Sequence, residues 1–128
     1  MFGDQIKNSV VVALDYDPAA DDDLSIWRAP QDVVVTAAYA WTQNTLAGST
    51  ANYFDLALYN GGTAGTALGT LAGTIGGTAG WTAQTPKTFT VSNGTVTAGQ
   101  LITARYNEEG TGTFTAMVIQ LDFVRGQQ

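Results

Sequence analysis

Five aspartates near the N-terminus are the densest group of side chains that could do chemistry. Asp15, Asp17, Asp21, Asp22 and Asp23 lie within the stretch DYDPAADDD. Calcium takes several carboxylate oxygens from one loop, so a cation site is one interpretation of this stretch. It lacks the turn glycine and the glutamate at the twelfth position of an EF-hand loop. A solvated acidic turn is the simpler hypothesis, and a calcium-stabilised adhesion domain is an alternative.

Groups that commonly carry enzymatic chemistry are sparse in the rest of the chain. The sequence contains no histidine and no cysteine, which excludes disulfides, thiolate nucleophiles and the usual zinc ligands. Glu108 and Glu109 are adjacent, and neighbouring side chains on extended backbone point to opposite sides, so they cannot flank one glycosidic bond. No serine has a histidine to activate it. We therefore predict that the protein is not an enzyme and needs no cofactor.

The charge of the chain argues against two classes of partner. The net charge is −6, and the five basic residues are scattered along the sequence. Nucleic-acid binding needs clustered cations that displace counterions from phosphates, and an anionic membrane surface needs them too. No apolar stretch approaches the roughly 20 residues of a membrane span, and Asp4 and Lys7 precede any apolar run. We expect no nucleic-acid partner, no membrane insertion and no cleaved secretion signal.

Exposed aromatic residues suggest a second binding hypothesis. Tyr53 and Tyr59 alternate with Phe54, Leu56 and Leu58 and so occupy the opposite face of their predicted strand. Aromatic rings on a β-sandwich can stack against sugar rings. A glycan platform that uses Tyr53 and Tyr59 is the corresponding alternative.

The elements that would position these residues are β-strands. Seven or eight short segments alternate apolar and polar residues and are separated by turn residues, and no dozen-residue window keeps a helical period. The clearest hairpin is predicted between residues 99–106 and 112–124, joined by Asn107-Glu108-Glu109-Gly110. The predicted fold is all-β, a two-sheet β-sandwich of the jelly-roll kind. We expect one sandwich domain over residues 1–128, with a flexible arm at 1–4 and a Gly/Thr-rich connection at 61–80 that carries short edge strands.

The low charge of the chain points to contacts with other proteins. Only 12% of residues are charged, about half the usual share, so the sheet surfaces suit burial against protein. In the strand predicted at 32–42, Val33, Val35, Ala37, Tyr39 and Trp41 form the apolar parity. The alternate residues of this strand and of the last strand lie on the opposite face, and we predict an interface there. The candidates are Val34, Ala38, Phe114 and Val118.

The second half of the sequence resembles a known group of viral proteins. The segments DLALYNGGTAGT, WTAQTPKTFTV, VTAGQLITARYNEEGTG and VIQLDFV resemble small jelly-roll decoration, or cement, proteins of tailed bacteriophages. The resemblance covers roughly residues 52–124 and lies in composition and strand order. It implies binding to the outside of the major capsid protein shell, often as homotrimers, and reinforcement of that shell against internal DNA pressure.

The functional prediction combines the resemblance with the composition. We expect a non-enzymatic decoration protein of a phage virion, made in the cytoplasm of the bacterial host and bound to the outer capsid surface through the major capsid protein. A homotrimer is the expected oligomer. The alternative is a glycan-binding β-sandwich module of a phage head or tail fibre.

Overall fold

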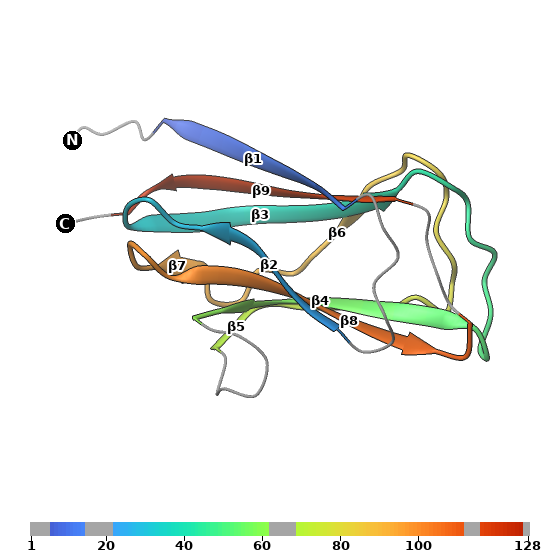
Figure 1. Ribbon diagram of the computed structural model, residues 1–128. Coiled ribbons are helices and arrows are strands. Elements are labelled where there is room, and N and C mark those ends of the chain that lie inside the picture. The colour runs from blue at the N-terminus through green and yellow to red at the C-terminus, as the bar shows by residue number, and fades with distance from the viewer. Residues whose placement is uncertain (1–5, 15–21, 62–68, 112–115, 127–128) are drawn as a thin grey trace.

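The computed structural model describes residues 6–14, 22–61, 69–111 and 116–126, all of them in strands or the turns and loops between strands. No helix that could cross a membrane occurs in these ranges. Nine strands follow one another along the chain (Figure 1): β1 (Lys7–Leu14), β2 (Asp22–Arg28), β3 (Val33–Thr42), β4 (Tyr53–Asn60), β5 (Gly69–Ile75), β6 (Lys87–Thr88), β7 (Thr95–Val96), β8 (Leu101–Glu109) and β9 (Met117–Arg125).

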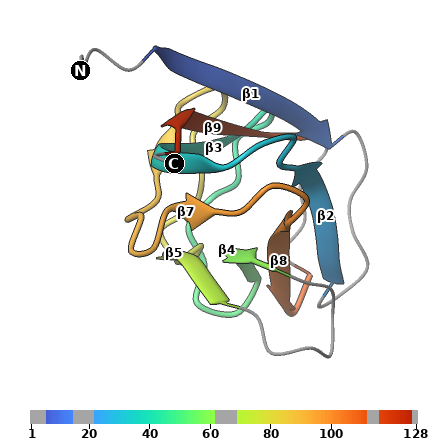
Figure 2. The ribbon, with the colours of Figure 1, turned by 90° about the vertical axis from the view of Figure 1, so that its left-hand side faces the viewer.

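The strands form two antiparallel sheets that face each other. Sheet A has the order β1-β9-β3-β6, with β7 also paired to β3, and sheet B has the order β2-β8-β4-β5. The end-on view in Figure 2 places β1 and β2 along one side of the molecule and β5 near the other. The structure confirms the predicted two-sheet β-sandwich, with nine strands where seven or eight were expected.

The pairing of the strands is nested. β1 pairs with β9, β2 with β8, β3 with β6 and β7, and β4 with β5, all antiparallel. The first four strands therefore pair with the later strands in reverse order, as in a long antiparallel hairpin whose turn lies between β4 and β5. This hairpin is wound around the core. This winding is the jelly-roll topology.

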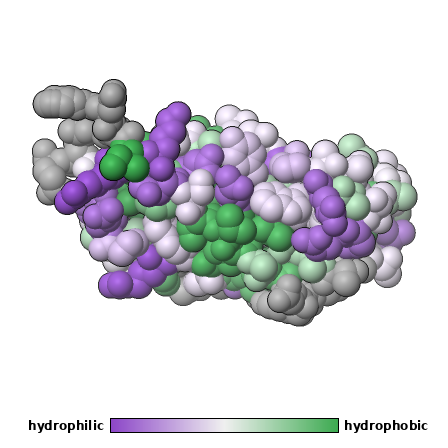
Figure 3. All heavy atoms as spheres, turned by 90° about the horizontal axis from the view of Figure 1, so that it is seen from above, coloured by the Kyte–Doolittle hydropathy of each residue, from purple (hydrophilic) through white to green (hydrophobic). Residues whose placement is uncertain are grey.

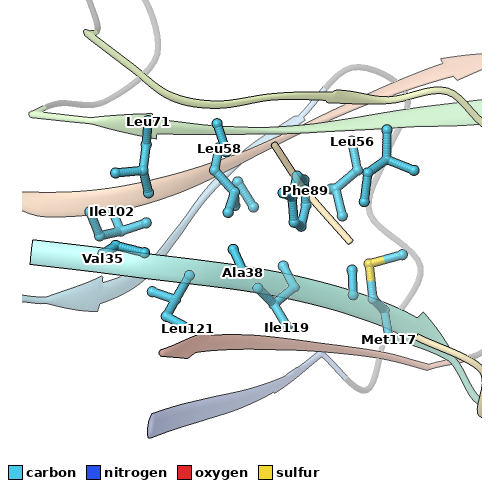
Figure 4. Packing of buried hydrophobic residues seen from close by; sticks show 14 of the residues in the cluster. Val35, Ala38, Leu56, Leu58, Leu71, Phe89, Ile102, Met117, Ile119 and Leu121 are labelled. Atoms are coloured by element: carbon cyan, nitrogen blue, oxygen red, sulfur yellow. The ribbon is translucent and has the colours of Figure 1, made fainter. Parts of the chain in front are cut away.

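The core lies between the two sheets and is filled by alternate side chains of the long strands (Figure 4). Leu56 and Leu58 of β4 face Ile119 and Leu121 of β9, and Phe89 lies between the layers. Each of these side chains is at most 3% exposed, and burying one such side chain stabilises the fold by roughly 1.5–3 kcal/mol. Burial of the inward faces accordingly holds the two sheets together.

One predicted hairpin is wrong. β8 belongs to sheet B and β9 to sheet A, so the segments expected to pair with each other lie in opposite layers. Residues 107–109, predicted to form the turn, continue β8, and the left-handed residue that ends it is Gly110, with φ +63°. Both strands are apolar on the face toward the core, and that pattern suits strands stacked across a core as well as strands side by side.

A bulge in β3 changes which of its residues face the core. The register between β3 and β9 shifts between Val35 and Ala37. Before the bulge Val33 and Val35 are buried, and after it Ala38 and Ala40 are buried. One extra residue in a strand moves all following side chains to the other face. The predicted parity therefore holds only for the first part of this strand.

Candidate interaction surface

The bulge places two large aromatic side chains on the outer face of sheet A. Trp41 is paired with Val118 of β9, and Val118 with Ala13 of β1; Tyr39 is paired with Gln120. Residues paired across antiparallel strands point to the same face, so these rows run across the outside of the sheet. We call the central part of this surface the A face and define it by eight outward residues: Ser9, Val11, Ala13, Tyr39, Trp41, Val118, Gln120 and Asp122. Lys7 and Val34, both paired with Val124, face outward beside it.

The A face is largely uncharged and partly apolar. Val11 is 56% exposed, whereas Val118 is only 8% exposed because it lies between Ala13 and Trp41. Tyr39 and Trp41 are half-buried. Figure 3 looks onto this side of the sandwich and shows hydrophobic atoms gathered near its middle. An open depression of about 310 Å³ is lined by Tyr39, Trp41, Pro86, Gln120 and Asp122.

The charged residue of the A face, Asp122, is held in a fixed position. The Ser9 hydroxyl donates a hydrogen bond of 2.6 Å to its Oδ1 atom, and the Gln120 side-chain amide donates one of 2.8 Å to the same oxygen. These two bonds, with the nearby charge of Lys7, hold the pKa of Asp122 below its usual value. The A face therefore presents aromatic and aliphatic area around one carboxylate that already has its partners, a composition typical of protein–protein contacts.

The four predicted interface residues separate in the structure. Val34 and Val118 lie on the outer side of sheet A, and their role in an interface stays a prediction. Ala38 is 0% exposed and lies in the core, so its prediction as an interface residue is wrong; the bulge turned it inward. Phe114 lies outside the described residues.

Sequence reasoning missed Tyr39 and Trp41 as surface residues. It grouped them with Val33 and Val35 on one face, as strict alternation requires. One feature of the sequence was consistent with the true arrangement: Ala38 and Ala40 are small enough to lie in the core beside Phe89. The Phe89 amide donates to the Ala38 carbonyl at 2.9 Å. Size alone does not locate a bulge in a strand that is apolar on both faces.

The aspartate cluster is only partly covered by the described residues. Asp15, Asp17 and Asp21 lie outside them, and Asp22 is described only as the first residue of β2. Asp23 binds Arg105 with both carboxylate oxygens, which counts against it as a calcium ligand. Within the described ranges, no three His, Cys, Asp or Glu residues gather as metal ligands would.

Asp23 and Arg105 form an ion pair on the outer face of sheet B. Arg105 Nε donates to Asp23 Oδ1 at 2.8 Å, and Arg105 Nη2 donates to Asp23 Oδ2 at 3.0 Å, so the ion pair is bidentate. The guanidinium carbon also lies 4.5 Å from the centre of the Tyr59 ring. The hydrogen bonds from Arg105 lower the pKa of Asp23, and Asp23 in turn raises the pKa of Arg105. This cluster ties β2, β8 and β4 together.

Replacing Asp23 with asparagine should lower stability by roughly 0.5–1 kcal/mol at pH 7, a modest amount because the Arg105 side chain is 33% exposed. The native pKa of Asp23 is depressed, so its stabilisation is present above the unfolded pKa of about 3.9 and is lost as pH falls through the native pKa. Thermal melts of both proteins should differ at pH 7 and converge once the pH has fallen below the depressed native pKa of Asp23. A double-mutant cycle of Asp23→Asn and Arg105→Gln isolates the energy of the pair. A difference in melting temperature that persists unchanged in acid would contradict this account.

The structure places Tyr53 and Tyr59, the candidates for a glycan platform, in different surroundings. They are six residues apart on β4, or about 20 Å along an extended strand, and the Tyr59 ring is covered by Arg105. Tyr53 instead helps to line a separate pocket of about 340 Å³ at the loop end of the sandwich, together with Phe54 and Trp81. Two polar side chains of that pocket are engaged in hydrogen bonds with loop backbone. Asn52 Oδ1 accepts from the Thr111 amide at 3.0 Å, and Ser49 Oγ accepts from the Asn52 amide at 2.9 Å.

Comparison with known proteins yields a weak structural match and no match in sequence. No protein-family model matches the sequence, and no curated protein is similar to it in sequence. A chain in the structure of infectious bursal disease virus, Gx strain, aligns with a TM-score of 0.44 and 12% sequence identity. The alignment covers 96% of this protein and 33% of that chain, so the protein spans about a third of the length of the viral chain it matches.

Proposed function

We propose that the protein is a non-enzymatic structural component of a phage virion, a decoration protein that binds the outer surface of the capsid. The A face carries this proposal. It combines the half-buried rings of Tyr39 and Trp41 with the exposed Val11, and its one carboxylate, which stays charged, already accepts hydrogen bonds from Ser9 and Gln120. Aromatic and aliphatic side chains with few charges favour a protein partner, here the major capsid protein.

A shell of repeated subunits suits such a surface. Each contact through one sheet face would be of modest strength, but copies that are linked to each other bind a repeated lattice with the combined strength of all contacts. We include self-association of the chain in the proposal for this reason. An acidic protein with net charge −6 is also repelled by nucleic acid, so released DNA would not compete with the shell for it. The chain would be made in the cytoplasm of the bacterial host and assemble onto the finished shell.

The location on the particle tests the proposal directly. Virions purified from a host culture that produces this chain, treated with a gold-labelled antibody against it and viewed in negative stain, should carry label over the capsid. Label at tail tips with bare capsids would overturn the proposal and would favour a glycan-binding fibre module. Virions without any label would also overturn it.

Trp41→Glu should weaken binding to capsids strongly, because it replaces the largest ring of the A face with a charge that must lose its hydration on contact. The readout is co-sedimentation of the purified protein with shells from which it has been removed, and we expect at least a tenfold loss of affinity. Thr70→Glu is the matched control. It adds the same charge at an exposed position of β5 in sheet B and should bind as the unmodified protein does. Equal loss for both variants would point to net charge and not to the A face.

A further inference from the structure

The free edge of sheet A is formed by a strand with little protection against pairing. β1 lies at the end of the sheet order and pairs only with β9. In the described structure no other backbone–backbone hydrogen bond reaches residues 6–14, so the outward N–H and C=O groups of this eight-residue strand have no backbone partner among the described residues. The strand contains no proline, glycine or bulge, and its one charge is Lys7 at the start. Such an edge is a template for another strand.

The other edges of the sandwich are protected by recognised devices. β2 has a bulge between Ser25 and Trp27 and two aspartates at its start. β5 contains two glycines, shifts register twice against β4, and accepts and donates backbone hydrogen bonds to residues 90–93 along its outer side. β6 and β7 are only two residues long. Edge strands are commonly blunted in these ways, and β1 is the long edge strand of the described structure that is not.

We propose that β1 pairs with β1 of a second copy of this chain, antiparallel and across a two-fold axis at Val11. In this register Val11 lies opposite Val11 of the partner, and Val10 lies opposite the partner's Val12. Inward residues then meet inward residues, so sheet A continues across the contact as one sheet. β-branched side chains that face each other across strands stabilise pairing, and Val11, at 56% exposed, gains the most from being covered.

The charge distribution favours a second copy as the occupant of this edge. The chain has eleven acidic residues, but none of them lies between residues 6 and 14. Two acidic molecules can therefore meet here without bringing like charges together, and the two Lys7 side chains lie at opposite ends of the contact in this register. The two-fold axis is perpendicular to the sheet, so the A faces of both copies lie on the same side of the dimer.

This contact closes after two copies, because both strands use the same edge. It thus differs from the homotrimer that the resemblance to decoration proteins implies. It concerns the isolated chain and does not depend on capsid binding, so either proposal can fail while the other stands.

Light scattering of the purified chain should give twice the mass of one chain, and Val11→Lys should reduce it to one. Two lysines opposite each other across the axis repel, and Val11 makes no core contact whose loss would unfold the monomer. Thr70→Lys, the same change on the exposed part of β5, should leave the dimer intact. A monomer or a trimer from the unmodified chain, or an unchanged dimer from Val11→Lys, would overturn the proposal.

Cysteine cross-linking tests the register, and the native chain contains no cysteine to confuse the result. Under mild oxidation Val11→Cys should form a disulfide-linked dimer. Ala13→Cys, two residues along the same face, should not, because its two copies would lie about 13 Å apart and a disulfide needs Cα atoms within about 7 Å. Linkage through Ala13→Cys and not Val11→Cys, or linkage of neither, would overturn the proposed pairing.

Discussion

Gly77→Ala should lower the free energy of unfolding by about 3 kcal/mol and the melting temperature by roughly 10 °C. Gly77 is buried after β5 and lies against the backbone of Phe54 in β4. A methyl group on Gly77 would overlap the Phe54 carbonyl oxygen and would approach the carbonyl carbon to 2.9 Å and the amide nitrogen to 3.1 Å. Because those atoms belong to a central strand, the clash can be relieved only by moving the sheet. Differential scanning calorimetry measures the effect.

The preceding residue supplies the control for this substitution. Gly76 is exposed, and the nearest atom to a methyl group there is Asp55 Oδ1 at 3.9 Å, an ordinary contact. Gly76→Ala should therefore change stability by no more than about 0.5 kcal/mol. If both variants melted with the unmodified protein, the close approach of Gly77 to β4 would be wrong.

Phe54→Ala should cost about 4 kcal/mol, near the upper end of the range for core truncations. The Phe54 side chain is 1% exposed, and its ring centre lies 5.2 Å from that of Trp81, nearly parallel to it, and 5.1 Å from that of Tyr106. Removal of the ring leaves a cavity bounded by two other aromatic groups and ends both ring contacts. Chemical unfolding monitored by tryptophan fluorescence reports the loss.

Phe54→Leu separates packing volume from ring contacts. Leucine keeps most of the apolar volume, so we expect a cost below about 1.5 kcal/mol. A loss of less than 1 kcal/mol for Phe54→Ala would show that the core at this end of the sandwich is not packed as described. A leucine variant as unstable as the alanine variant would instead assign the effect to the aromatic contacts.

The fold class was predictable because its signal is local. Alternation along Tyr53 to Asn60 marks a strand with one buried face, and the structure buries Phe54, Leu56 and Leu58 as that alternation predicts. Partnership between strands is not local. The last two long strands, β8 and β9, are neighbours in sequence and apolar toward the core, yet they lie in different sheets because the nested winding pairs β9 with β1 and β8 with β2.

The candidate surface was less predictable than the fold. Val118 was placed on the correct face because β9 alternates without interruption, whereas Ala38 and Trp41 were exchanged by the bulge in β3. Bulges in strands that are apolar on both faces leave no trace in the alternation. The edge position of β1 could not be predicted from the sequence either. A run of valines predicts a buried strand, and only the order of strands in the sheet shows that β1 lies at an edge.

The pairing of β1 with β9 has a consequence for the synthesis of the protein. Ser9 and its hydrogen-bond partner Asp122 are separated by 113 residues, so the first strand waits for the last before it gains a neighbour in its sheet. Until β9 has been translated, β3 has only the two-residue strands β6 and β7 as partners in its sheet, and sheet A stays incomplete. Pairings between distant segments form slowly because closing a long loop costs entropy in advance. The valine-rich first strand therefore has no partner in its sheet during translation, and this is the interval in which a chaperone that binds unfolded chains would have the most to bind.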